Sequence, residues 1–231
     1  MPNNFVTVDI GNSSPNFMLH ESGQIKGPFP IVKWQEHLRE LPHFVSSVSS
    51  YDLPAESIID FSHHKKDRLF MDMPMNYTAT IGDDRIIQAY YLYKHFINKS
   101  FCLIDAGTFT TIDFISKTGF EGGYIIPSKS TLAKCFYNQG SKLPDIKSSS
   151  EFLVDRIPHS TEEAIGTTVE IMFGQTIKHI SNKINSSYKI VITGGRYLEL
   201  LEHIKVYNSI EIIPNLLHHS LAYLGNREAL K

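Results

Sequence analysis

One pattern occurs twice along this chain of 231 residues, and it constrains the fold more than any other feature. The β-rich residues 5–8 run into the turn Asp9-Ile10-Gly11-Asn12, after which a second short strand is expected. Residues 101–104 run into Asp105-Ala106-Gly107-Thr108 in the same way, and a strand over residues 111–115 follows. This repetition predicts an α/β protein built from two similar lobes that face one another across a cleft.

The two copies divide the chain into an N-terminal lobe, residues 1–99, and a C-terminal lobe, residues 100–231. Apolar residues at helical spacing after two acidic residues predict a helix over residues 83–98, which closes the first lobe. The residues that give this spacing are Ile86, Tyr90, Tyr93 and Ile97.

The second lobe is expected to contain a long helix. Ser160 and Glu163 form a capping-box pattern ahead of an apolar run that continues to Ile177. A strand is expected over residues 189–192, a helix over residues 198–204 and a mobile connection over residues 138–151.

Composition narrows the class of protein. Hydrophobic residues make up 42% of the chain, enough for a sizeable core, and the net charge of -2 comes without any long basic run. We therefore expect neither nucleic acid nor a membrane as a partner, and a cytoplasmic location. Cys102 and Cys135 are expected to be reduced thiols. The histidine pairs His63-His64 and His218-His219 match no metal-binding motif and are interpreted as surface or packing residues.

The two turns carry the residues suited to chemistry. A polar, glycine-containing turn after a buried strand can hold phosphate oxygens through backbone N–H groups, although a single copy is more typical of a simple hairpin. The second copy favours phosphate binding by both. Carboxylates such as Asp9 and Asp105 would repel an ATP tail without a cation, so Mg²⁺ or a monovalent ion is expected beside them. The sequence has no P-loop, dinucleotide-binding or protein-kinase motif.

The order of four motifs makes the interpretation specific. Asp-x-Gly-Asn at 9–12, Gly-x-Asp-Arg at 82–85, Asp-x-Gly-Thr at 105–108 and Thr-Gly-Gly at 193–195 resemble type III pantothenate kinases of the actin-like ATPase superfamily. The resemblance implies two ribonuclease H-like lobes and ATP-dependent phosphorylation of pantothenate to 4'-phosphopantothenate, the first step of coenzyme A biosynthesis. It also implies ATP with Mg²⁺, a monovalent cation such as K⁺ or NH₄⁺, and a homodimer.

The same resemblance assigns roles to individual residues. Asp84 matches the catalytic base, which would orient the attacking hydroxyl and accept its proton. Arg85 matches a residue that holds pantothenate, and Asp105 matches the ligand of the monovalent cation. The residues implied in ATP binding are Asp9, Ile10, Gly11, Asn12, Ser13, Ser14, Pro15, Asn16, Thr108, Gly194 and Gly195.

Substrate contacts are also implied for Tyr77, Gly82, Asp83 and Thr161. Helix capping explains Thr161 equally well, and packing explains Tyr77 equally well. The sequence departs from the family at Ser13, at Ser14-Pro15 and at Ser128. Two alternatives therefore stay open: a non-catalytic regulator of the same fold, and a kinase of this superfamily that acts on another small molecule.

Overall fold

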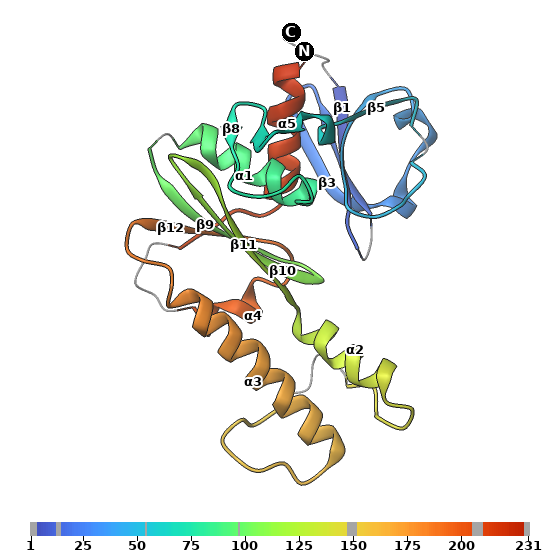
Figure 1. Ribbon diagram of the computed structural model, residues 1–231. Coiled ribbons are helices and arrows are strands. Elements are labelled where there is room, and N and C mark those ends of the chain that lie inside the picture. Colours follow the sequence, from blue (N-terminus) through green and yellow to red (C-terminus); the bar gives the residue numbers. More distant parts are fainter. Residues whose placement is uncertain are drawn as a thin grey trace. The chain divides into compact units, whose positions relative to one another are not determined.

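The computed structural model describes residues 4–12, 15–53, 55–96, 98–146, 152–204 and 210–228 (Figure 1). The chain forms two compact units, each discontinuous in sequence. Unit 1 contains Met1–Phe101, Asp113–Gly122 and Ile213–Lys231, and unit 2 contains Cys102–Ile112 and Gly123–Ile212. The functional division at residues 99 and 100, with a cleft between the lobes, remains a prediction.

The first sheet lies in unit 1 and has the strand order β3-β2-β1-β4-β5. β1 pairs with β2 antiparallel and with β4 parallel, and this register places Asp9 opposite Asn16. The strands are β1 (Asn4–Ile10), β2 (Asn16–Glu21), β3 (Gln24–Pro30), β4 (Pro42–Ser47) and β5 (Ser57–Asp60). Unit 1 also holds a small sheet of β6 (Lys65–Lys66), β7 (Leu69–Phe70) and β8 (Met73–Pro74), and short 3₁₀ helices at Ile31–Lys33, Glu36–Leu38 and Ser62–His64.

The second sheet repeats the first, with the order β11-β10-β9-β12-β13. β1 and β9 even share one pattern of burial, with four consecutive buried residues followed by a partly exposed aspartate. The strands are β9 (Ser100–Ala106), β10 (Phe109–Ser116), β11 (Gly119–Pro127), β12 (Tyr188–Thr193) and β13 (Ile210–Ile212). The repeated α/β architecture that the two Asp-x-Gly turns predict is thus confirmed.

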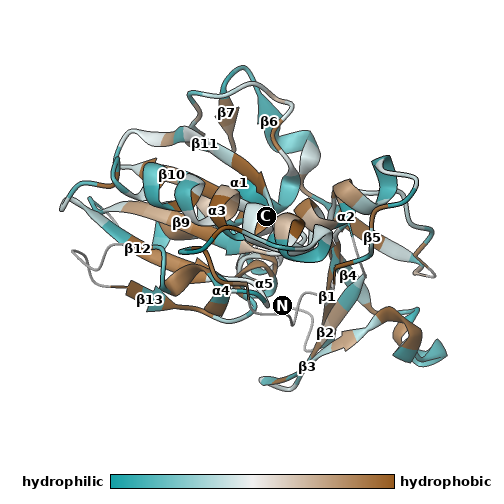
Figure 2. Ribbon diagram, turned by 90° about the horizontal axis from the view of Figure 1, so that it is seen from below, coloured by the Kyte–Doolittle hydropathy of each residue, from teal (hydrophilic) through white to brown (hydrophobic). Residues whose placement is uncertain are grey.

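Two helices of unit 1 cover its sheet. α1 (Asp83–His95) and α5 (Leu216–Glu228) pack against each other and against β4, and α5 also packs against β1. A Cβ atom at Gly225 would overlap the ring of Phe44, so a glycine there allows α5 to approach β4 closely. Figure 2 shows hydrophobic residues along the strands, and Val6, Val8 and Ile10 of β1 belong to the core of this unit.

Unit 2 contains the helices α2 (Lys129–Gln139), α3 (Thr161–Ser181) and α4 (Leu198–Leu201). α2 packs against α3, and a small core forms around Ala133, Ile165 and Val169. Ser160 caps α3 by accepting a hydrogen bond from the N–H of Glu163 at 3.1 Å, as the capping-box pattern predicts.

Several predicted elements differ from those observed. The helix predicted over residues 83–98 ends at His95, because Phe96 leaves the helical conformation, and Ile97 lies outside the described residues. The helix predicted over residues 198–204 ends at Leu201. The mobile connection predicted over residues 138–151 begins within helix α2, which ends at Gln139. Residues 147–151 of this connection are not described. Cys102 and Cys135 are both present as thiols. In the described parts of the chain, no helix has the length and apolar character needed to span a membrane.

Candidate active site

The first of the two predicted phosphate-binding loops follows β1 in unit 1. Its start is fixed from the end of β4, because the Val48 N–H donates to the carbonyl oxygen of Ile10 at 3.0 Å and the Ser49 hydroxyl donates to that of Gly11 at 3.0 Å. Asn12 is exposed, as expected for a residue that meets a ligand, whereas Ser13 and Ser14 lie outside the described residues.

The loop returns to the sheet through Pro15 and Asn16. The carbonyl oxygen of Pro15 accepts a hydrogen bond from the N–H of Ile31 at 3.0 Å. The side-chain amide of Asn16 donates to Oδ2 of Asp9 at 3.2 Å and thereby ties the end of the loop to its beginning.

Two partly buried carboxylates, those of Asp9 and Asp84, are neighbours in unit 1. Burial raises the pKa of Asp9 to about 6; the Asn16 hydrogen bond opposes this rise and the charge of Asp84 adds to it. Burial likewise raises the pKa of Asp84, although that carboxyl accepts the N–H of Arg85 at 2.8 Å. The structure thus brings together the predicted phosphate-binding acid and the predicted catalytic base.

Glycine at position 82 allows Asp84 its conformation. A Cβ atom on Gly82 would overlap Oδ1 of Asp84, so a larger residue would displace this carboxylate from the start of α1. Asp83 belongs to a different contact, because it forms an ion pair with Nζ of Lys65 at 2.6 Å. The same Nζ donates to the carbonyl oxygen of Ile81 at 3.0 Å and holds the segment before the helix.

Arg85 is buried and paired. Its Nε lies 3.1 Å from both carboxylate oxygens of Asp113, and its Nη2 lies 2.5 Å from Oδ1. The guanidinium carbon also lies 5.4 Å from the ring centre of Tyr77 and 5.9 Å from that of Phe120. The bidentate ion pair with Asp113 and the two neighbouring aromatic rings together fix the direction of the guanidinium.

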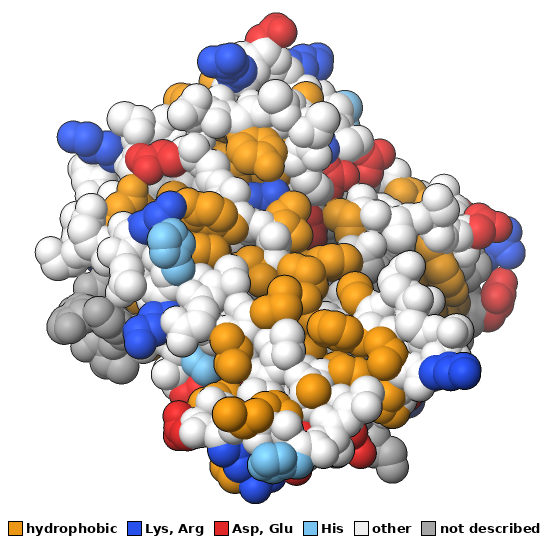
Figure 3. All heavy atoms as spheres, turned by 60° about the horizontal axis from the view of Figure 1, so that its bottom comes forward, with side chains coloured by type: hydrophobic (Ala, Val, Ile, Leu, Met, Phe, Trp, Pro, Cys, Tyr) orange, Lys and Arg blue, Asp and Glu red, His pale blue; other side chains and the backbone are white. Residues whose placement is uncertain are grey.

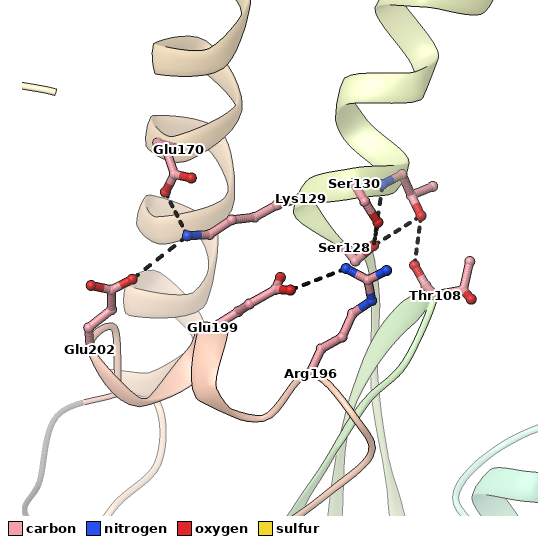
Figure 4. Close-up of polar contacts among 9 residues, drawn as sticks. Thr108, Ser128, Lys129, Ser130, Glu170, Arg196, Glu199 and Glu202 are labelled. Atoms are coloured by element: carbon pink, nitrogen blue, oxygen red, sulfur yellow. Dashed lines mark hydrogen bonds and ion pairs between the residues drawn. The ribbon is translucent and has the colours of Figure 1, made fainter. Parts of the chain in front are cut away.

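The second predicted phosphate-binding loop, in unit 2, is held at the start of α2 (Figure 4). The carbonyl oxygen of Thr108 accepts hydrogen bonds from the N–H of Ser128, at 3.2 Å, and from the hydroxyl of Thr131, at 2.8 Å. Ser128 is also the N-cap of α2, since its hydroxyl accepts the N–H of Thr131 at 3.3 Å. Ser128, where the family usually has glycine, thus has a defined structural task.

The turn after β12 packs directly onto this second loop. Gly194 has φ +88°, and a Cβ atom there would lie 2.5 Å from the carbonyl oxygen of Ala106, so only glycine fits. A Cβ atom on Gly195 would meet nothing within 4 Å. The N–H of Arg196 donates to the same Ala106 oxygen at 3.0 Å. The structure therefore brings Gly194 and Gly195 beside the strand end that leads to Thr108 and leaves space over Gly195.

Charged side chains brace these elements of unit 2 (Figure 4). Lys129, the first residue of α2, lies 2.6 Å from a carboxylate oxygen of Glu170 on α3 and 3.7 Å from one of Glu202. Arg196 lies 3.2 Å from a carboxylate oxygen of Glu199. These ion pairs connect α2, α3 and the segment that contains α4.

Thr161 is exposed at the first turn of α3 and is not the capping residue, since Ser160 accepts the capping hydrogen bond. Its predicted contact with pantothenate stays a prediction. Asp105 is partly exposed at the end of β9 and has polar interactions of its own, and its predicted role as a cation ligand also stays a prediction. No group of three or more His, Cys, Asp or Glu side chains suited to a metal occurs within the described ranges.

Three residues that contact the predicted site residues were not predicted from the sequence. Asp113 is fully buried, and an acidic residue inside the apolar strand over residues 111–115 was the available signal for a buried ion pair. Arg196 directly follows the predicted Gly194-Gly195 turn. His218 lies in α5 and hydrogen-bonds to Asn16, a contact that no local pattern indicates.

Comparisons with known proteins agree with this architecture. The sequence model of the type III pantothenate kinase family matches residues 55–183. The type III pantothenate kinase of Aquifex aeolicus is 28% identical over 245 residues, which cover 96% of this chain and 99% of that protein. The corresponding protein of Hahella chejuensis is 29% identical and covers 88% of this chain and 91% of its own length.

Two solved structures share the fold. A Campylobacter jejuni protein assigned to the Baf family of transcriptional activators matches with a TM-score of 0.63 at 18% identity, covering 98% of this chain and all of that one. A Sinorhizobium meliloti protein assigned as a 2-dehydro-3-deoxygalactonokinase matches with a TM-score of 0.59 at 10% identity, covering 97% and 96% of the two chains. The chain therefore has the same α/β fold as these two proteins. Because the family model matches more than half of its length, this chain belongs to the type III pantothenate kinase family.

Proposed function

We propose that this protein transfers the γ-phosphoryl group of ATP to the primary hydroxyl of pantothenate and forms 4'-phosphopantothenate, the first step toward coenzyme A. The observation that carries the proposal is the carboxylate of Asp84, which belongs to the Gly-x-Asp-Arg motif and lies near Asp9. The chain that carries this motif belongs to the type III pantothenate kinase family.

Asp84 acts on the acceptor hydroxyl. Burial raises the pKa of its carboxyl, which makes the carboxylate a stronger base toward a weakly acidic alcohol. Phosphoryl transfer depends mainly on alignment of the hydroxyl with the phosphate, so the base must also be held in one direction. The hydrogen bond from the Arg85 N–H and the space left by Gly82 hold Asp84 in this way.

Arg85 recognises the carboxylate of pantothenate. Asp113 pairs with the Nε and Nη2 atoms, so the substrate carboxylate approaches from the Nη1 side of the guanidinium. A guanidinium held by Asp113 loses little freedom when a second carboxylate arrives. Gly82 and Asp83 shape the start of the helix, and Thr161 is assigned to the same substrate.

The two glycine-containing loops bind ATP. The loop from Asp9 to Asn16 takes phosphate oxygens on its backbone N–H groups, and Thr108 with the Gly194-Gly195 turn takes the nucleotide in unit 2. Asp9 and Asp84 support the fit to a cation, because burial raises the pKa of both carboxyls and a bound cation would offset the cost of their charge. Bound Mg²⁺ supplies neutralisation of phosphate charge, and Asp105 is assigned to a monovalent cation such as K⁺ or NH₄⁺.

A homodimer in the cytoplasm completes the proposal. Unit 2 exposes several large apolar side chains, including Ile157 at 80% and Leu153 at 63%, with Ile171 and Met172 on α3. Figure 3 shows hydrophobic side chains gathered at the surface of the molecule. Exposed groups of this kind are typical of protein interfaces, and sedimentation of the purified protein tests the dimer directly.

The decisive experiment is a coupled assay that contains purified folded protein, ATP, Mg²⁺, K⁺ and pantothenate. We expect turnover that depends on all of them. Binding of nucleotide or pantothenate without product would indicate a regulator of the same fold, and turnover of another acceptor but not pantothenate would indicate a different kinase. An analogue with an alcohol in place of the carboxylate tests Arg85: the wild type should discriminate against it, and Arg85→Met should not.

A further inference from the structure

A continuous row of buried side chains crosses unit 1 and ends at Asp9. Nε2 of His20 on β2 lies 3.2 Å from the hydroxyl of Thr7, which lies 2.9 Å from Nδ1 of His218 on α5. Nε2 of His218 lies 2.6 Å from Oδ1 of Asn16, whose amide nitrogen lies 3.2 Å from Asp9. Four hydrogen bonds thus link five side chains from three elements.

The chemistry of the last two groups fixes the direction of every hydrogen bond. An ionised carboxylate only accepts, so Asn16 donates its N–H to Asp9 and turns its carbonyl oxygen toward His218. That carbonyl can only accept, so Nε2 of His218 carries a proton. Nδ1 of a neutral His218 then accepts from Thr7, and the Thr7 oxygen accepts from Nε2 of His20.

Both histidines remain uncharged at neutral pH. Burial lowers the pKa of His218 to about 3, and the neighbouring His20 and His219 lower it further. Burial also lowers the pKa of His20 to about 4, together with the charge of His219. A neutral ring that donates from Nε2 and accepts at Nδ1 matches the side chains of Asn16 and Thr7, and the ring also interacts with the backbone of Thr7.

His218 is buried in a helix that is otherwise largely apolar at its start. It is 4% exposed, and Leu216, Leu217 and Leu221 of the same helix are also buried. A further leucine would cost less desolvation than an imidazole, so the polar side chain needs a reason other than packing. Its contact with Asn16 offers that reason, because an amide side chain without a second partner can rotate and present either its oxygen or its nitrogen to Asp9.

We propose that His218 is a positioning residue, which orients the Asn16 amide so that it donates to Asp9 and holds this carboxylate for phosphate and cation binding. The consequence for turnover rests on the proposed kinase function. The hydrogen-bond arrangement itself does not, so the two can fail separately. Residues that orient a ligand-binding group from behind typically contribute 10- to 100-fold in affinity or activity.

Two substitutions separate the two hydrogen bonds of His218. The amide nitrogen of His218→Gln reaches the place of Nε2 and keeps the bond to Asn16, whereas the amide of His218→Asn reaches only the place of Nδ1 and keeps the bond to Thr7. We expect His218→Asn to raise KM for Mg·ATP or lower kcat by roughly 10- to 100-fold and His218→Gln to restore most of the loss. His219→Asn, one residue along the helix, is the matched control and should behave as the wild type.

Two measurements exclude a merely structural effect. His218→Asn should add no loss to Asn16→Ala, because both remove the same contact, and a full additional loss would overturn the proposal. In ¹⁵N spectra of the protein without substrates, the His218 nitrogen facing Asn16 should carry the proton and the one facing Thr7 should not. The opposite tautomer, a charged ring at neutral pH, or equal losses in the Gln and Asn variants would overturn the assignment, whether or not the protein phosphorylates pantothenate.

Discussion

In the first repeat the aspartate near the end of β1, Asp9, is held by side chains, whereas in the second repeat Ala106 and Thr108 are held through their backbone carbonyl groups. Asp9 is bound by Asn16, which His218 holds in turn. The loop at Thr108 is fixed through its carbonyl oxygen and through the backbone of Gly194. The sheet order is the same in both, so the difference arises in what surrounds each loop.

The difference suggests that the first repeat serves catalysis and the second serves nucleotide binding. Side chains carry titratable groups and suit bond making, and in the first repeat Asp9 and Asp84 lie together. Backbone groups suit the binding of the base and sugar of a nucleotide, because the reaction does not alter these parts. In the second repeat, Gly195 leaves open space in which a nucleotide could lie. Substitutions in the first repeat should therefore act on catalysis and its pH dependence, and those in the second on stability and nucleotide affinity.

The largest effect should come from Asp84→Asn in the first repeat. We expect kcat to fall about 10²- to 10⁴-fold, because the amide cannot accept the proton of the acceptor hydroxyl. The melting temperature should stay the same or rise, since the raised pKa of Asp84 means that its buried charge is costly. Asp72→Asn, which alters a carboxylate that accepts the hydroxyl of Tyr90, is the control for the loss of one charge and should leave kcat unchanged.

Two neighbouring glycines test the second repeat. Gly194→Ala should lower the free energy of unfolding by roughly 3–5 kcal/mol, because it combines a positive φ with overlap against the backbone of Ala106. Gly195→Ala adds its methyl group to open space and should leave stability unchanged. Its expected effect is a weaker affinity for ATP, measured by calorimetry. Unaltered ATP affinity in a folded Gly195→Ala protein would contradict the assignment of this turn to the nucleotide.

Local patterns in the sequence were sufficient for the repeated part of the fold. The strand, turn and strand of each repeat depend on residues adjacent in the chain, as does the capped start of α3 at Ser160. Helix α5 was not predicted, and its place against β1 depends on contacts between residues far apart in sequence. For that reason His218 was interpreted as a surface or packing residue, whereas its ring joins Thr7 to Asn16.

The motif residues were predictable as members of a site, but their surroundings were not. Arg85 was predicted to be a substrate contact, and the structure shows that Asp113 of β10 pairs with it. Asp83 follows Gly82 in the same motif, yet its ion pair with Lys65 depends on a segment folded back from earlier in the chain. Spacing indicates which residues share a loop, while side-chain partners depend on tertiary packing.

The free energy of unfolding should depend on pH through Asp9, in the first repeat. The folded protein binds a proton at Asp9 with a pKa of about 6, above the value near 4 expected in the unfolded chain. The free energy of unfolding should therefore gain on the order of 2 kcal/mol from Asp9 as the pH falls through 6 toward 4. Denaturant titrations without nucleotide or divalent cations should show this gain relative to Asp9→Asn, which lacks the group. A parallel pH profile for the two proteins would contradict it.

The smallest expected effect compares two helix caps within unit 2. Ser128→Ala and Ser160→Ala each remove a hydroxyl that accepts an N–H of the first helical turn, and each should lower the free energy of unfolding by about 1 kcal/mol. Only Ser128 lies at the helix start that holds the Thr108 carbonyl, so only Ser128→Ala should also weaken ATP binding. Calorimetric titration of both variants with ATP measures the difference. Equal ATP affinities at equal stability would show that α2 does not position the second loop for the nucleotide.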